Sequence, residues 1–130
     1  MTNTKKKEVP IAVLKEYFRV PVHELPIHYS GRAVLLGSVI TNMSTTGVFV
    51  RTPQPLEKGA EVEISFLLPG TKKEIKTKAV VRWSSGPEAG KKRDPGSPQG
   101  MGLQFVKMSS PQRKMVNKYV EDFLARMRGA

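Results

Sequence analysis

A short polar segment, Asn42-Met43-Ser44-Thr45-Thr46-Gly47, lies between two apolar runs at residues 33–40 and 48–50. Asn and Ser side chains can hydrogen-bond to their own backbone, and glycine can adopt the positive φ that ends a tight turn. The pattern therefore predicts a turn that joins two strands. Such a turn also presents an amide, a hydroxyl and open backbone N–H groups at one rim of a sheet, which suits a polar ligand. On spacing alone, a plain hairpin connection without a ligand is the simpler interpretation.

Short segments in which apolar residues recur at every second position dominate the rest of the chain up to residue 106. This period is typical of strands that bury one face. The clearest case is the alternation of Val62, Ile64 and Phe66 with Glu61, Glu63 and Ser65. About six strands are expected, within residues 25–29, 33–40, 48–50, 62–68, 75–83 and 101–106.

A C-terminal helix is expected over residues 110–128. Ser110 suits the N-cap and Pro111 the first helical position, and apolar residues then recur at helical spacing from Met115 to Met127. A small barrel closes its own edges, and such a helix can cover one face or mouth of it. The predicted fold class is therefore mainly β, a six-stranded antiparallel barrel with a C-terminal amphipathic α-helix.

The length of 130 residues allows one domain with a modest core. We expect this domain to span residues 15–128. Residues 1–14 are expected to form a flexible basic N-terminal arm. Residues 84–100 are rich in Pro and Gly and are expected to form a long flexible loop rather than a second domain.

The segment Val9–Phe18 is compatible with two conformations, a helix that begins near Pro10 or an extended arm. Lys15 and Arg19 are four residues apart. In a helix this spacing places both on one face, and in an extended chain it places both on one side. In either conformation, two cations are expected to project together.

The chain is strongly basic, with 22 Lys and Arg against 11 Asp and Glu and a net charge of +11. A surplus of this size favours an anionic partner such as a nucleic acid, a nucleotide, an acidic protein or a lipid headgroup. A barrel that binds nucleic acid usually exposes a row of aromatic side chains for base stacking. Phe66, Trp83 and Phe105 are instead all expected to face the core. This pattern argues against nucleic acid as a partner, and charge alone identifies no ligand.

The sequence offers little for catalysis or metal binding. It has no cysteine, so neither a disulfide nor a thiolate metal site is possible. His23 and His28 are five residues apart in an expected strand, so they point to opposite faces, and no carboxylate cluster accompanies them. No Gly-rich phosphate loop is present. We expect no enzyme, no metal site and no cofactor.

No apolar run approaches the length of a membrane span, and no signal-peptide core follows the basic N-terminus. The sequence therefore predicts a protein of the cytoplasm without a membrane span.

The order and spacing of these segments resemble the PilZ domain family. The signature of that family is Arg-x-x-x-Arg before the first strand and [Asp/Asn]-x-Ser-x-x-Gly after the second. Asn42–Gly47 fits the second element fully, and Arg19 corresponds to the second Arg of the first element. Residues 79–83 and 100–105 resemble later strands of the family, and residues 113–127 resemble its closing helix. The resemblance implies a six-stranded barrel with a C-terminal helix and cyclic di-GMP as the ligand.

Carried over to this chain, the family's ligand positions are Arg19, Asn42, Ser44 and Gly47. Lys15 stands where the family has its first Arg, and it is therefore a weakened ligand position. A lysine can neutralise a phosphate, but it lacks the planar fork and the stacking surface of arginine. The lost interactions amount to roughly 1–3 kcal/mol.

Three functions are compatible with this pattern. The resemblance implies a bacterial cyclic di-GMP receptor that relays the second messenger to an unidentified effector protein, with motility, envelope polysaccharide or virulence as the output. Lys15 favours a degenerate adaptor that binds protein directly and ignores the nucleotide, whereas the intact Asn42–Gly47 motif favours the receptor. The third function, a small barrel that binds nucleic acid, is motivated only by the net charge.

Overall fold

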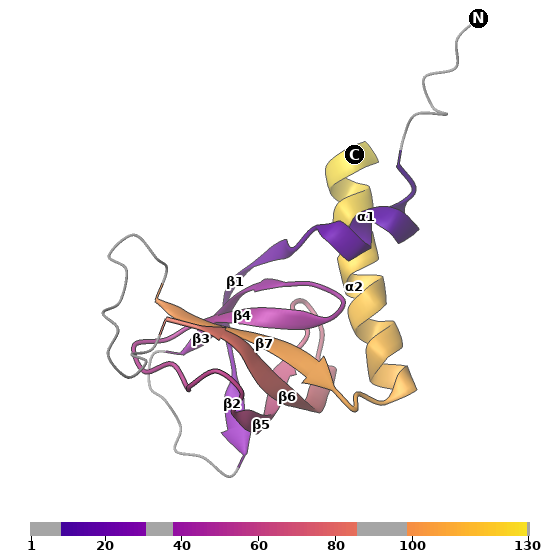
Figure 1. Ribbon diagram of the computed structural model, residues 1–130. Helices are drawn as coiled ribbons and strands as arrows, with labels where there is room; N and C mark the ends of the chain where they lie inside the picture. Colours follow the sequence, from indigo (N-terminus) through magenta and orange to yellow (C-terminus); the bar gives the residue numbers. More distant parts are fainter. Residues whose placement is uncertain (1–8, 31–37, 86–98, 130) are drawn as a thin grey trace, which may run out of the picture.

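The computed structural model describes residues 9–30, 38–85 and 99–129, which form one curled antiparallel sheet and two helices (Figure 1). The order of strands in the sheet is β1-β3-β4-β7-β6-β5-β2. The expected mainly-β fold with a C-terminal helix is confirmed. The elements are α1 (Ile11–Tyr17), β1 (Val20–Pro26), β2 (His28–Ser30), β3 (Val39–Met43), β4 (Gly47–Arg51), β5 (Glu61–Leu67), β6 (Glu74–Ser84), β7 (Gly100–Val106) and α2 (Ser110–Gly129).

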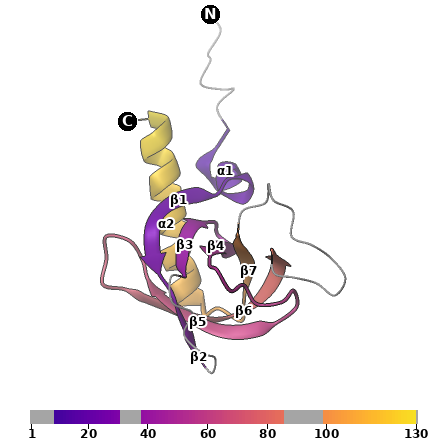
Figure 2. The ribbon, with the colours of Figure 1, turned by 90° about the vertical axis from the view of Figure 1, so that its left-hand side faces the viewer.

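The two edge strands of the sheet, β1 and β2, are consecutive segments separated only by Ile27. β1 pairs with β3, where Leu25 lies opposite Ile40, and β2 pairs with β5, where Tyr29 lies opposite Ile64. One continuous segment therefore pairs with β3 and with β5, and this pairing curls the sheet. Figure 2 shows the segment running down one side of the sheet from α1 to β2. This change of partner explains why seven strands are observed where six were expected.

The core lies inside the curled sheet and under α2. Val62, Ile64 and Phe66 of β5 are each at most 5% exposed, which confirms the alternation seen in the sequence. Val116 and Val120 of α2 are fully buried against this core. Fully burying a side chain of this kind contributes about 1.5–3 kcal/mol, so α2 is an integral part of the domain.

The N-terminal segment is a helix over α1 and becomes extended at Phe18, where φ is −115° and ψ is 142°. The helical alternative for this segment is therefore correct up to Tyr17, and the extended one applies from Phe18 onward. α1 packs against α2 at the side of the sheet (Figure 1). The arm expected over residues 1–14 thus ends in ordered helix from Ile11, and its residues 1–8 lie outside the described part of the chain.

Two boundaries differ from the expected ones. Asn42 already belongs to β3 and Gly47 to β4, so the turn itself is shorter than the polar segment. α2 begins at Ser110, and its cap is Ser109, whose Oγ accepts a hydrogen bond from the backbone N–H of Gln112 at 3.4 Å. Residues 33–37 of the expected second strand and residues 86–98 of the expected long loop lie outside the described ranges.

Tyr29 is the one buried side chain of the described ranges whose polar atom lacks a hydrogen-bond partner there. The residue is 6% exposed, and burial, the larger effect, raises the pKa of its hydroxyl to about 12, whereas the neighbouring Ser38 hydroxyl lowers it. Ser38 itself donates to Thr52 Oγ1 at 2.7 Å. A buried hydroxyl without a partner costs about 1–3 kcal/mol, so the Tyr29 hydroxyl opposes folding although its buried ring favours it.

We expect Tyr29→Phe to raise the free energy of unfolding by about 1 kcal/mol, because it removes the unpaired hydroxyl and keeps the ring. Urea unfolding followed by circular dichroism measures this change. Tyr119→Phe is the control, since Tyr119 is only partly buried and should change stability little. A loss of about 1 kcal/mol or more in Tyr29→Phe would show that the hydroxyl is hydrogen-bonded.

Candidate ligand-binding site

Arg19 lies between the end of α1 and the start of β1, next to the strand pair that carries the polar turn. In that pair Pro21 lies opposite Asn42. The Arg19 guanidinium donates from Nε to Asn42 Oδ1 and from Nη1 to Ser44 Oγ, the latter at 3.3 Å. Partial burial lowers the pKa of Arg19, but a guanidinium stays charged at any physiological pH. The structure therefore joins the side chains of three of the five sequence-predicted site residues in one network.

The turn that follows β3 is held by its own hydrogen bonds. The Ser44 backbone N–H donates to the Gly47 carbonyl at 2.9 Å, and the Thr46 N–H donates to Ser44 Oγ at 3.2 Å. The Thr46 carbonyl also accepts from the Phe105 N–H of β7 at 2.8 Å. Ser44 therefore holds both the turn and the side chain of Arg19. The rim of the sheet is a preformed surface rather than a loose loop.

Gly47 is required at this position for a reason that the sequence did not indicate. Gly47 was expected to adopt a positive φ, and this prediction is wrong. The described glycines with a positive φ are Gly59 and Gly70. A Cβ on Gly47 would lie 2.1 Å from the carbonyl oxygen of Leu103 in the neighbouring strand β7. The absence of a side chain allows the two strands to approach each other.

A shallow cleft of about 320 Å³ opens beside Arg19 and the turn. Its lining includes Arg19, Thr46, Gly47, Phe49, Arg82 and Trp83. Phe49 and Trp83 form an aromatic pair, with ring centroids 5.6 Å apart. Arg82 donates from Nε to Gln104 Oε1 at 2.6 Å, which fixes its guanidinium at the edge of the cleft. The cleft thus combines two guanidinium groups with an exposed aromatic surface.

The position of Trp83 corrects a prediction. Trp83 was expected to face the core, but it is 39% exposed. The pairing of β6 with β7 shifts register between Val81 and Trp83, so a β-bulge reverses the side on which the following side chains lie. Phe66 is buried as expected, and Phe105 is partly buried with its ring stacked on that of Phe66. Arg82 and Trp83 were therefore missed as site residues, because regular alternation gives no sign of a bulge.

Lys15 is directed to a different part of the molecule from Arg19. Its Nζ lies 2.7 Å from Glu121 Oε2 of α2, and the two side chains are only 20% and 37% exposed. Lys15 lies in the helix, which ends at Tyr17, whereas Arg19 lies in the extended chain that begins at Phe18. The segment between them is therefore neither wholly helical nor wholly extended. The prediction that Lys15 and Arg19 project together is therefore wrong. Lys15 instead connects α1 to α2 through its ion pair with Glu121.

Other kinds of site find no support in the described residues. Within those ranges, no three His, Cys, Asp or Glu side chains gather in a way that would hold a metal ion. His23 and His28 are both exposed. Among the helices that the structure describes, none has the length and apolar character needed to cross a membrane.

Comparison with known proteins identifies the family. The PilZ domain family matches residues 14–122, a range that includes the C-terminal part of α1, the whole sheet and most of α2. The chain belongs to the PilZ domain family. Asn42, Ser44 and Gly47, which lie along the rim of this PilZ domain, are the positions that match its polar motif, and Arg19 is bonded directly to that motif.

A solved structure of the Bacillus subtilis inhibitor of motility, MotI/DgrA, resembles this PilZ domain with a TM-score of 0.64 and 19% sequence identity. The likeness covers 85% of this chain and 50% of that one, so the chain spans about half the length of that protein. At this identity the likeness shows the fold alone. No curated protein matches the sequence significantly.

Proposed function

We propose that this PilZ domain is a receptor for cyclic di-GMP that relays the level of the second messenger to an effector protein. The observation that carries the proposal is the bonding of Arg19 to Asn42 and Ser44 at the edge of the cleft. These two bonds use two of the five N–H donors of the guanidinium and leave three for a ligand. A held guanidinium with free donors is suited to phosphate oxygens and to the O6/N7 edge of guanine.

The aromatic side of the cleft supports the same ligand. Trp83 is partly exposed beside Phe49, and a purine base can stack on such a surface. Arg82 adds a second guanidinium near the same surface. A ligand with two phosphates and two guanine bases matches the combination of cations and aromatic rings better than a simple anion does.

Lys15 supports a second candidate, an adaptor that does not respond to the nucleotide. Lys15 is paired with Glu121, and it would have to leave this partner in order to reach a phosphate. Breaking a half-buried ion pair of this kind opposes ligand binding. Under either candidate, we propose that the domain acts on an effector protein. The proposed output is motility, envelope polysaccharide or virulence.

Calorimetric titration of the purified protein with cyclic di-GMP at physiological salt tests the proposal. We expect saturable binding in the parent protein and tighter binding in Lys15→Arg, because arginine restores the fork that lysine lacks. Glu121→Gln is expected to tighten binding too, since it frees Lys15. Absence of binding in the parent with binding in Lys15→Arg would support the adaptor. Absence in both would contradict the receptor.

A further inference from the structure

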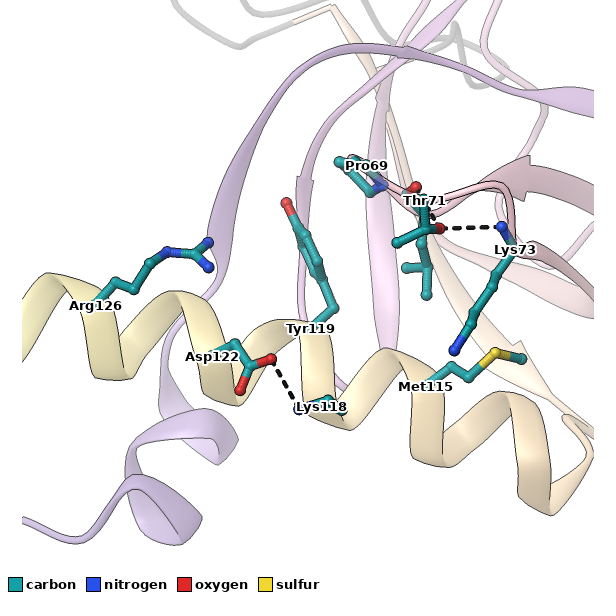
Figure 3. A pocket seen from close by; sticks show the side chains of 10 residues that line it. Pro69, Thr71, Lys73, Met115, Lys118, Tyr119, Asp122 and Arg126 are labelled. Carbon is teal, nitrogen blue, oxygen red and sulfur yellow. Dashed lines mark hydrogen bonds and ion pairs between the residues drawn. The ribbon is translucent and has the colours of Figure 1, made fainter.

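A second concave surface lies between α2 and the connection from β5 to β6, and it shares no lining residue with the Arg19 cleft. Its volume is about 390 Å³. Figure 3 shows Tyr119 standing from α2 toward Pro69, with Met115 one turn away on the same helix. Leu68 adds to the apolar lining. We refer to this surface as the α2 groove.

The wall of the α2 groove opposite the helix is preformed. The Leu68 N–H donates to the Lys73 carbonyl at 3.0 Å, and the Thr71 N–H donates to the Leu68 carbonyl at 3.1 Å. Thr71 Oγ1 donates to the Leu68 carbonyl at 2.9 Å and accepts from the Lys73 N–H at 3.1 Å. Gly70 has a φ of 74°, which allows the chain to turn tightly here. A partner would therefore meet a fixed surface and would not have to order a loop.

The charges around the α2 groove are unbalanced. Three lining residues are basic, Lys73, Lys118 and Arg126, and one is acidic, Asp122. Asp122 is already paired with Lys118, at 3.2 Å. In the described part of the chain, Lys73 and Arg126 have no acidic partner. In Figure 3 the side chain of Lys73 descends toward Met115, and that of Arg126 extends beside Tyr119. Two unpaired cations thus flank an apolar floor.

We propose that the α2 groove docks an acidic peptide segment of a partner protein. An apolar side chain of the peptide would lie on Met115 and Tyr119, and its carboxylates would meet Lys73 and Arg126. Burial of aromatic and methionine side chains supplies most of the affinity in such contacts, and complementary charge sets orientation and specificity.

The same features argue against nucleic acid as the occupant. A strand of nucleic acid needs a track of cations along its backbone and stacking surfaces for successive bases. The α2 groove has one aromatic ring, and its cations stand on either side of an apolar floor of limited volume. This docking site does not require cyclic di-GMP, so it stands apart from the proposed receptor function and would serve the receptor and the adaptor alike.

Selection of random-sequence peptides displayed on phage against the full chain tests this docking site. We expect the enriched peptides to combine acidic residues with an aliphatic or aromatic one. Affinity of the most enriched peptide is then measured by fluorescence anisotropy for two charge-reversed double variants. The first is Lys73→Glu with Arg126→Glu, which alters the groove. The second is Lys72→Glu with Arg113→Glu, whose two exposed residues lie outside the lining and give the same change in net charge.

The groove variant is expected to bind the peptide at least about tenfold more weakly, and the control variant within about twofold of the parent. Amide chemical shifts of the labelled parent protein should move around Tyr119 and not around Arg19. Equal weakening of both variants, enrichment of peptides without acidic residues, no enrichment, or shifts centred on Arg19 would each overturn the proposal. So would tighter binding of a mixed-sequence single-stranded RNA that depends on Lys73 and Arg126.

Discussion

Replacing Gly47 with alanine is expected to lower the free energy of unfolding by about 3 kcal/mol, because overpacking against backbone leaves no side chain that can move aside. The added Cβ would lie 2.1 Å from the carbonyl oxygen of Leu103 and 3.3 Å from the Cα of Gln104. Gly47 is paired with Gln104 in the ladder between β4 and β7. Relief of the clash requires these two strands to separate, and their separation would disturb the turn that holds Ser44.

Gly102→Ala is the matched control for this prediction. It lies in β7 of the same sheet, but its Cβ would contact only the Cβ of Trp83, at an ordinary 3.8 Å. Its free energy of unfolding should stay within about 1 kcal/mol of the parent, since the loss of backbone entropy in the unfolded chain offsets small strain. Urea unfolding of both variants measures the difference. If Gly47→Ala proved as stable as Gly102→Ala, the close approach of β4 and β7 would not be the reason for this glycine.

The parts of this fold that the sequence predicts well depend on local patterns. The alternation of Val62, Ile64 and Phe66 predicted both the strand and its buried face, because a regular strand repeats every two residues. The helical stripe that contains Val116 and Val120 was equally informative. In both cases the residue pattern and the buried face come from one uninterrupted element.

The features that escaped prediction depend on pairing between distant segments. The division of one strand at Ile27 arises because its halves pair with β3 and with β5, which the segment's own residues do not indicate. The exposure of Trp83 follows from a bulge against β7. The pairing of Lys15 joins residues that are 106 positions apart. In the candidate site, the motif predicted Arg19, Asn42 and Ser44, whereas the aromatic pair of Phe49 and Trp83 became visible only in the folded chain.

Replacing Arg19 with alanine is expected to weaken cyclic di-GMP binding by at least about 100-fold, which corresponds to about 2.8 kcal/mol. Hydrogen bonds to a charged group contribute about 1.5–3 kcal/mol each, so two bonds from this guanidinium to the ligand are sufficient for the loss. The substitution also frees Asn42 and Ser44 from their shared partner. Since Arg19 lies at the surface, only partly buried and outside the core, the free energy of unfolding should change by less than about 1 kcal/mol.

Arg51→Ala is the control for Arg19→Ala, because it removes an exposed arginine that pairs with Glu24 and does not line the cleft. Its affinity for cyclic di-GMP, measured in the same calorimetric titration, should stay within about twofold of the parent. Trp83→Ala tests the aromatic wall and should lose roughly 5- to 150-fold, the equivalent of one stacked base. Equal losses in Arg19→Ala and Arg51→Ala would mean that the ligand responds only to net charge. Unchanged affinity in Arg19→Ala and Trp83→Ala, with binding in the parent, would contradict this cleft as the binding site, because both residues line it.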